Sequence, residues 1–281
     1  MIVLSLISII GIAITGLIVG FLSGLFGVGG GFVIVPILNI VFGISYNIVI
    51  GSSLAAISII SLLGITKHHK QSHVNTKLGL ILLAGTLPGV EFGARLLVKL
   101  TNSGFINVFI DTAFLIVFVG AFSIMVFEYI RWVNENKTSC DLTDYKIGFY
   151  CFKKETGFNN SVNIFYLLAC GFLIGILQGM LGVGGGFMLI PVLVNFFGLP
   201  ARLVIGTCLF VIFPSSGYGA ITHFFKGNIN FILVALILSG SIIGTLIGSS
   251  FTAKLKGKKI RLYFIFLIAL AIIMMGLKIM L

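Results

Sequence analysis

The sequence predicts an all-α polytopic membrane protein made of two inverted five-segment repeats, with short helices broken by glycine. Three observations lead to this fold class. The 281-residue chain is 58% hydrophobic and 9% charged, whereas a soluble domain carries roughly 25% charged residues. No charged residue or histidine occurs among the 66 residues before Lys67, which as helix would extend roughly 100 Å, about three bilayer thicknesses. The stretch GLFGVGGGFVIVPIL at 24–38 also returns as GMLGVGGGFMLIPVL at 179–193.

Ten apolar runs bounded by polar or turn residues are the expected membrane segments. The first, at about 2–24, is expected to be a retained helix, because it lacks the basic start and the cleavage site of a signal peptide. Two runs that follow the glycines, at 32–43 and 187–198, would form only roughly 18 Å of helix against a core of about 30 Å. The full spans are expected at 2–24, 46–66, 77–98, 105–130, 162–181, 201–225, 229–252 and 259–281.

The two halves of the chain align at an offset of 155 residues. From Gly24 to Leu54, 15 of 31 positions are identical to the residue 155 positions later. Such a match is far more than chance gives, even in an apolar composition, so both halves are expected to share one five-segment unit. The chain is therefore divided into a first transmembrane repeat at 1–130, a polar central loop at 131–160 and a second transmembrane repeat at 161–281.

Loop charges indicate that the second repeat is inverted relative to the first. The loop after the third segment has three basic residues in the first half (Lys67, Lys70 and Lys77), while its mate has Lys226. After the fourth segment the bias reverses, from two basic residues to five. Because basic loops stay in the cytoplasm, an inverted repeat is expected. The central loop would be cytoplasmic and both termini outside, in a multi-pass protein of the cell (inner) membrane.

The glycine triplets predict helix breaks that bind an anion through backbone groups. Consecutive glycines allow positive φ angles, and the short helix that follows presents unpaired N–H groups and the positive end of its dipole. Short, glycine-interrupted segments at matching positions of two halves are typical of a transporter's substrate site. Close packing is the alternative, but it requires glycines spaced by four, as in the series from Gly85 and Gly240. The candidate glycines are Gly29, Gly30, Gly31, Gly184, Gly185 and Gly186.

Polar side chains near these breaks are few. Ser52, Ser53 and Thr207 could donate hydroxyl groups to a substrate, although such residues often bond to carbonyl groups of their own helix. Gln178 occupies the position of Ser23 in the other half and could either contact the substrate or satisfy the break. Further hydroxyl candidates are Ser61, Ser215 and Ser216.

Charged side chains inside the spans are candidates for coupling or gating, because charge in hydrocarbon is costly. Glu91 and Arg95 are four residues apart and can pair on one helix face, either as a structural ion pair or around a proton-coupling carboxylate. Arg202 could attract an anion or extend to the membrane interface. His68 and His223 fall at helix ends, where interface histidines are favoured over a proton relay. The four cysteines show no CxxC spacing, so neither a metal nor a cofactor is expected.

The paired motifs resemble those of the sulfite exporter TauE/SafE family, also called the TSUP transporters. The resemblance rests on GLFGVGGGFVIVPIL and GMLGVGGGFMLIPVL, each followed by a short turn and by Gly51-Ser52 or Gly206-Thr207, and it spans nearly the whole chain. It implies a membrane transporter, often an exporter, of a small anion such as sulfite, an organosulfonate or another sulfur-containing or carboxylate anion.

The function expected from residues and resemblance together is transport of a small anion by alternating access. An anion channel of the same architecture is the alternative. An enzyme is not expected, because the chain has no HExxH motif, no paired catalytic aspartates and no Ser-His constellation at a credible spacing. The net charge of +11 sits largely in short loops, so it indicates topology rather than a nucleic-acid partner. The expected partners are the anion and the lipid bilayer, with proton or sodium coupling left open.

Overall fold

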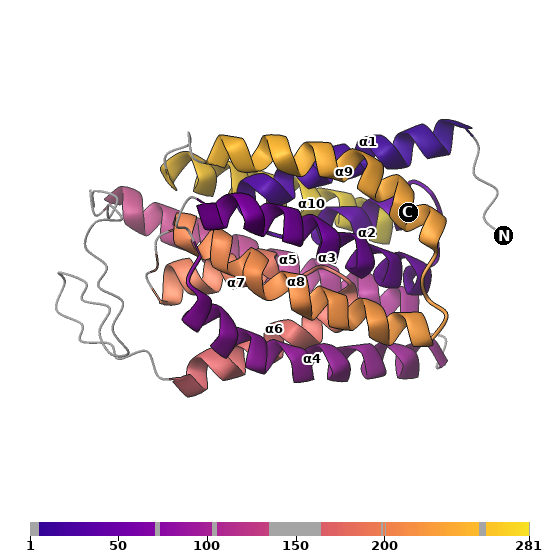
Figure 1. Ribbon diagram of the computed structural model, residues 1–281, viewed down its shortest axis with the longest axis horizontal. Coiled ribbons are helices and arrows are strands. Elements are labelled where there is room, and N and C mark those ends of the chain that lie inside the picture. The colour runs from indigo at the N-terminus through magenta and orange to yellow at the C-terminus, as the bar shows by residue number, and fades with distance from the viewer. Residues whose placement is uncertain are drawn as a thin grey trace.

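The computed structural model describes residues 6–70, 74–102, 106–134, 164–197, 199, 201–252 and 257–280. Within these ranges the chain is helical and contains no strand (Figure 1). Most of the expected central loop at 131–160 lies outside the described residues. The helices are α1 (Leu6–Phe26), α2 (Gly31–Ile40), α3 (Tyr46–Lys70), α4 (Thr76–Asn102), α5 (Ile106–Asn134), α6 (Ile164–Leu181), α7 (Gly186–Pro191), the π-helix η2 (Val192–Phe196), α8 (Ala201–Phe225), α9 (Phe231–Thr252) and α10 (Gly257–Met280).

Seven of the described helices are long and apolar enough to cross a membrane, which confirms the all-helical, multi-pass class. They are α1, α3, α4, α5, α6, α8 and α9. The sequence predicted eight. The difference is α10, whose apolar part among the described residues, Leu262–Lys278, belongs with the shorter helices.

The short segment of the second half differs from the continuous helix expected at 187–198. α7 ends at Pro191, and the chain continues as the π-helix η2. Proline has no N–H to donate and its ring crowds the preceding turn, but this alone does not produce the π-helix. Pro36, the equivalent residue of the first half, lies inside α2, which remains α-helical through Ile40.

Each of the main helix pairs joins one half of the chain to the other. α1 packs along α9, α4 along α6, α3 against α8, and α5 against α10 (Figure 1). α4 and α9 also begin alike, because the side-chain oxygens of Asn75 and Asn230 accept the N–H groups of Leu78 and Leu233. Such bonds cap the first turn of a helix. The two halves are therefore interleaved.

Glycines spaced by four residues bring these helices into backbone contact. A Cβ atom at Gly20 of α1 would overlap the carbonyl oxygen of Ser241 on α9, and one at Gly244 of α9 would overlap that of Leu17. The packing role predicted for this spacing is confirmed. The glycines of these interfaces are Gly16, Gly20, Gly24, Gly240, Gly244 and Gly248 between α1 and α9, and Gly85, Gly89, Gly93, Gly171, Gly175 and Gly179 between α4 and α6.

Candidate functional site

The two glycine runs are breaks between helices. α1 ends at Phe26 and α2 begins at Gly31, while α6 ends at Leu181 and α7 begins at Gly186. The glycines between them adopt the left-handed conformation, which glycine reaches at little cost and most side chains do not. Both breaks therefore require glycine at equivalent positions. The positive φ angles are those of Gly27 (70°), Gly29 (80°), Gly30 (77°), Gly182 (71°), Gly184 (76°) and Gly185 (75°).

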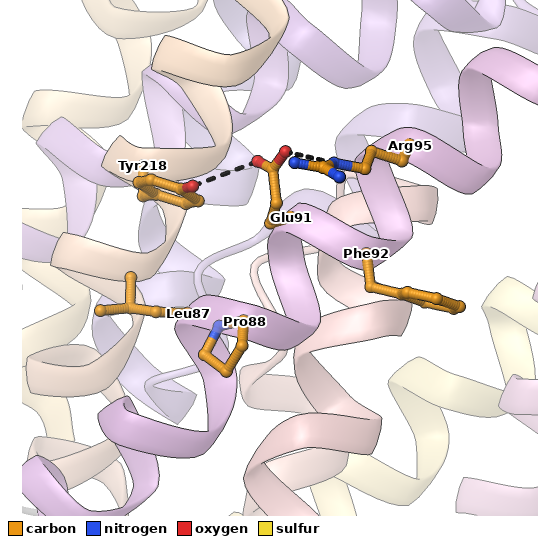
Figure 2. A pocket seen from close by; sticks show the side chains of 6 residues that line it. All are labelled: Leu87, Pro88, Glu91, Phe92, Arg95 and Tyr218. Carbon is orange, nitrogen blue, oxygen red and sulfur yellow. Dashed lines mark hydrogen bonds and ion pairs between the residues drawn. The ribbon is translucent and has the colours of Figure 1, made fainter.

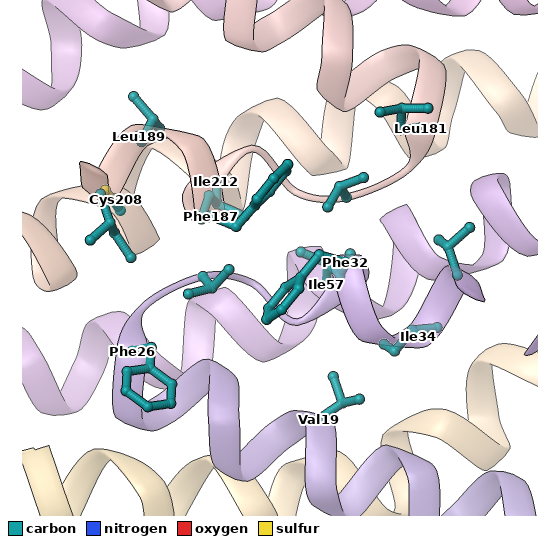
Figure 3. Close-up of a cluster of buried hydrophobic side chains, with 14 of the residues drawn as sticks. Val19, Phe26, Phe32, Ile34, Ile57, Leu181, Phe187, Leu189, Cys208 and Ile212 are labelled. Atoms are coloured by element: carbon teal, nitrogen blue, oxygen red, sulfur yellow. The ribbon is translucent and has the colours of Figure 1, made fainter. Parts of the chain in front are cut away.

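The two breaks lie against each other (Figure 3). A Cβ atom at Gly31 would lie 2.5 Å from the carbonyl oxygen of Gly182, and one at Gly186 would lie 2.8 Å from that of Gly27. Both separations are too short for real carbon atoms. The backbone of each short helix thus begins directly beside the loop of the other half.

The start of α2 has free hydrogen-bonding capacity. Its N-cap is Gly30, and no side chain caps the helix. The N–H groups of Val33 and Ile34 both bond to the carbonyl oxygen of Gly30, at 3.1 and 3.2 Å. Within the described residues, the preceding N–H groups of Gly31 and Phe32 have no acceptor. Unpaired N–H groups and the helix dipole together favour an anion at this position.

Apolar side chains fill the space where the two breaks meet. A Cβ atom at Gly29 would lie 3.0 Å from Cγ2 of Ile57, and one at Gly184 would lie 3.1 Å from the same atom. Ile212, the repeat mate of Ile57, contacts the Gly186 position in the same way, at 2.6 Å. Ile57 and Ile212 are both buried, and Figure 3 shows them beside the breaks. The breaks are therefore closed toward each other in this conformation.

Ser52 and Thr207, two of the predicted substrate ligands, connect helices of opposite halves. The N–H of Asn230, at the start of α9, donates to the Ser52 hydroxyl, and the N–H of Asn75, at the start of α4, donates to the Thr207 hydroxyl, both at 3.0 Å. Thr207 also donates to the carbonyl oxygen of Leu203 at 2.8 Å. Each hydroxyl thus already has a partner within the protein, and a contact with substrate remains a prediction.

Ser53 and Gln178 lie at the second break. Ser53 donates to the carbonyl oxygens of Ile50 and Gly182, at 2.9 and 3.1 Å. The Nε2 atom of Gln178 donates to the hydroxyls of Ser215 and Ser216, each at 2.9 Å. All these polar side chains are buried. The structure thus places four of the hydroxyl and amide candidates at the second break: Ser53 at Gly182, and Gln178, Ser215 and Ser216 bonded to one another beside Gly185.

Glu91 and Arg95 form the ion pair that their spacing predicts, at 2.7 Å. The other Glu91 oxygen accepts hydrogen bonds from the hydroxyls of Tyr218 (3.1 Å) and Thr222 (3.3 Å) on α8. These side chains border a pocket of about 430 Å³ (Figure 2). Its lining residues are Leu87, Pro88, Glu91, Phe92, Arg95 and Tyr218. None of these six belongs to the glycine breaks, so any role of Glu91 in coupling would act at a distance from them.

Two further basic residues belong to the ends of α8. Lys226 follows the helix and donates to the carbonyl oxygen of Ala94 at 3.1 Å. Burial lowers the pKa of Lys226 below its usual range, while the Glu91 carboxylate acts in the opposite direction. Arg202 lies in the first turn of α8, and its side chain is outside the described part of the structure.

His68 and His223 are buried rather than exposed at an interface. The Nε2 atom of His68 lies 3.3 Å from the carbonyl oxygen of Gly24, and that of His223 lies 3.3 Å from the carbonyl oxygen of Gly179. Each histidine thus meets the last turn of the helix that precedes a glycine break. An equivalent contact in both halves favours a structural link.

A cluster around Lys278 was not found by sequence reasoning. The Lys278 ammonium donates to Asn39 (2.6 Å), Asp111 (2.7 Å) and Tyr46 (2.8 Å). The Tyr46 hydroxyl also donates to Asp111. The signal was present, since Asp111 is the one acidic residue of the apolar run at 106–127 and Lys278 lies in the apolar run at 262–280. The cluster ties the end of α2 to α3, α5 and α10.

A bundle of membrane-length helices around two facing glycine breaks defines a multi-pass membrane protein of the transporter class. The family model described as sulfite exporter TauE/SafE matches residues 12–275. The chain therefore belongs to the TauE/SafE family of membrane transporters, which confirms the resemblance inferred from the motifs.

Similar proteins carry transporter names. The chain is 28% identical over 258 residues to the probable membrane transporter protein YunE of Bacillus subtilis, covering 89% of this chain and 90% of that protein. It is 30% identical over 221 residues to the probable membrane transporter protein MJ0441 of Methanocaldococcus jannaschii, covering 76% and 72%. It is also 28% identical over 106 residues to sulfite exporter TauE/SafE family protein 1 of Arabidopsis thaliana, covering 38% and 23%. No solved structure matches the chain.

Proposed function

We propose that this transporter exports a small anion by alternating access, and that the paired glycine breaks form its substrate pathway. The observation that carries the proposal is the start of α2, where the N–H groups of Gly31 and Phe32 have no acceptor among the described residues. An amide site of this kind binds an anion without a charged side chain. It lies where the two halves of the chain meet, as substrate sites of repeat transporters do.

The proposed substrate class is sulfite, an organosulfonate, or a related sulfur-containing or carboxylate anion. Membership of the sulfite exporter TauE/SafE family supports this class, and so does the similarity to sulfite exporter TauE/SafE family protein 1 of Arabidopsis. Export is proposed on the same basis. The neutral, amide-rich setting suits a small oxyanion, because each oxygen can accept from a backbone or hydroxyl donor.

An inverted repeat at 1–130 and 161–281 is part of the proposal. The chain starts α1 at the right end of Figure 1 and starts α6 at the left end. Helix pairing between halves recurs at the same offset, with α1 on α9 and α6 on α4. With the reversed loop charge, this supports a cytoplasmic central loop and outer termini in the inner membrane.

Alternating access would open the closed centre on one side at a time. Ile57 and Ile212 block the meeting point of the breaks in this conformation. Rocking of the interleaved halves would move these side chains apart, as in other inverted-repeat transporters. Glu91 is the proposed site of proton coupling, because a carboxylate in a span is costly and this one borders a pocket together with Tyr218 of α8.

The experiment is flux through the purified full-length protein in liposomes, with a panel of sulfite, thiosulfate, sulfoacetate, sulfate and acetate. We expect at least one oxyanion to move at a rate that saturates with concentration and responds to an imposed proton or sodium gradient. Strictly downhill flux with conductance in a planar bilayer would favour the channel of the same architecture. Movement of none of these anions would contradict the proposal.

A further inference from the structure

The two glycine breaks differ at one polar position. Gln178 precedes the second break, and Ser23, 155 residues earlier, precedes the first. The Gln178 carboxamide lies beside Gly185, with Oε1 3.1 Å from where a Cβ atom of that glycine would be. Its Nε2 atom donates to the hydroxyls of Ser215 and Ser216. The Gln178 side chain thus occupies the space beside the second break and gives both hydroxyls a partner. The N–H groups of Gly186 and Phe187, like those of Gly31 and Phe32, have no acceptor within the described residues.

The first break has no such group. Ser23 has the same place beside its glycine, with its Cβ 3.6 Å from where a Cβ atom of Gly30 would be. Ser61 is the repeat mate of Ser216. Both hydroxyls, of Ser23 and Ser61, are fully buried, and neither has a hydrogen-bond partner within the described residues. In the second half, the Gln178 carboxamide, at the position equivalent to Ser23, bonds to Ser216, at the position equivalent to Ser61.

Buried hydroxyls without partners are costly and rare. Each unsatisfied group costs roughly 1–3 kcal/mol, and a native structure that keeps one commonly holds a water, ion or ligand there. Ser23 lies beside Gly30, and the repeat assigns Ser61 to the same break, because its mate Ser216 bonds to Gln178 at the second break. The ten-residue helix α2 begins at the adjacent Gly31, uncapped by any side chain. The second short helix, α7, is likewise uncapped and continues into η2, so the two breaks differ in these polar side chains rather than in their helix starts.

We propose that the two breaks have different roles: the first binds the transported anion between Ser23, Ser61 and the start of α2, and the second is permanently occupied by Gln178. This assignment rests on the proposed function and places the substrate site in the first half of the chain. The second break then acts as the rigid surface against which the first opens and closes.

The ligand class follows from the donors that the first break offers. The hydroxyls of Ser23 and Ser61 can both donate, as can the amides of Gly31 and Phe32. A site of donors alone selects an anion with at least two oxygens on one central atom. Halides, which have a single centre, would bind more weakly.

The test compares three single variants of the full-length protein in detergent, with the panel anion that the wild type transports fastest as the probe. Ser23→Gln copies the carboxamide into the first break, and we expect it to abolish anion binding measured by titration calorimetry. Without anion, its melting temperature should equal or exceed that of the wild type, because the carboxamide gives Ser61 a partner. Ser61→Ala removes one donor and should weaken binding roughly ten- to a hundredfold.

Ser241→Ala is the matched control. Ser241 is also a buried hydroxyl without a partner among the described residues, but it lies on α9 against α1. The Ser241→Ala variant should bind the anion as the wild type does.

Wild-type binding by both Ser23→Gln and Ser61→Ala would overturn the assignment, as would loss of binding in Gln178→Ser alone. In either case the wild type would still transport the anion, so the proposed function would remain valid. A wild type that transports no anion of the panel would instead overturn the proposed function together with the site. If Ser23→Gln does not fold, Ser61→Ala decides the outcome.

Discussion

Phe32 and Phe187, the first residues after the two glycine triplets, stack on each other with ring centroids 5.9 Å apart and planes 19° from parallel. Phe118 of α5 meets both rings edge-on, at 6.3 and 5.7 Å. The starts of α2 and α7 are therefore held together by aromatic contact as well as by backbone contact. Any motion that separates the breaks has to separate this pair, which is worth about 0.5–1.5 kcal/mol beyond its buried area.

Removing the isoleucine side chains between the breaks is expected to make the protein leaky. The double variant Ile57→Ala, Ile212→Ala removes the atoms that contact Gly29, Gly184 and Gly186. We expect faster downhill anion flux in liposomes and a weaker response to an imposed gradient. Because the two residues are repeat mates, each single variant should produce a similar, smaller effect. Tight, gradient-driven flux in the double variant would contradict the role of these side chains as a seal.

A methyl group added to one of the glycines between α1 and α9 is expected to destabilise this helix pair. In Gly244→Ala the new Cβ would overlap the carbonyl oxygen of Leu17, so α1 and α9 must separate. Overpacking of this kind costs roughly 1–3 kcal/mol, which a melting curve in detergent would register as a clear fall.

Gly120→Ala is the control for this substitution. Gly120 lies in α5, and its new Cβ would meet nothing within 4 Å. Alanine favours helix by about 1 kcal/mol over glycine, so the melting temperature should stay level or rise slightly. Equal effects at Gly120 and Gly244 would disprove the packing argument.

Breaking the pair between Lys278 and Asp111 is expected to destabilise the protein strongly. The side chains of Lys278 and Asp111 are 22% and 13% exposed, so Lys278→Met would leave a largely buried carboxylate unpaired, at a cost of roughly 3–5 kcal/mol. The double variant Lys278→Met, Asp111→Asn should regain much of this loss, and a double-mutant cycle of melting temperatures would measure the coupling. Additive effects would show that the two charges do not interact.

Ser52→Ala and Thr207→Ala are expected to cost similar amounts of stability. Each removes the acceptor for a backbone N–H at the start of α9 or α4, at roughly 1 kcal/mol. Thr207→Ser keeps the hydroxyl and should behave nearly as the wild type. A changed KM for the anion at an unchanged melting temperature would instead support the substrate role that the sequence suggested.

Glu91→Gln is expected to reduce gradient-driven transport and leave the fold intact. Glutamine can still accept from Tyr218, and the Arg95 side chain is 73% exposed, so losing that ion pair should cost only about 0–1 kcal/mol. The measurement is uptake into liposomes with and without a proton gradient. Unchanged proton-driven uptake would remove Glu91 as a coupling residue, and Arg95→Gln tests whether the ion pair itself matters.

Much of the fold could be predicted from local properties of the chain. Hydropathy places a helix at each apolar run, and the glycine triplets predict the breaks at Phe26 and Leu181, because only glycine adopts consecutive left-handed conformations cheaply. The spacing of four residues also predicts the contact surfaces of α4 and α9. The π-helix after Pro191 was missed, since the same motif continues as an α-helix in the first half.

The candidate site was predicted less completely, because most of its contacts join distant residues. Ser52 was chosen for its hydroxyl, but sequence gave no sign that Asn230 would occupy that group. Lys278 and Asp111 are 167 residues apart, and each looked like an isolated charge. The lack of a partner for Ser23 is likewise a property of the packed structure alone.

Sequence alone was enough to show that this chain is a membrane protein, approximately where most of its helices lie, and that its two halves share a repeated motif with matching breaks. These follow from hydropathy, backbone conformational preference and repetition, which are written in short stretches of residues. The packed helices were needed to learn that α1 pairs with α9, that α4 pairs with α6, and that Gln178 bonds to two serines while Ser23 has no partner within the described residues. In lipid every apolar helix surface is equally well solvated, so the choice of partner depends on shape and hydrogen bonds that exist only once the helices have packed.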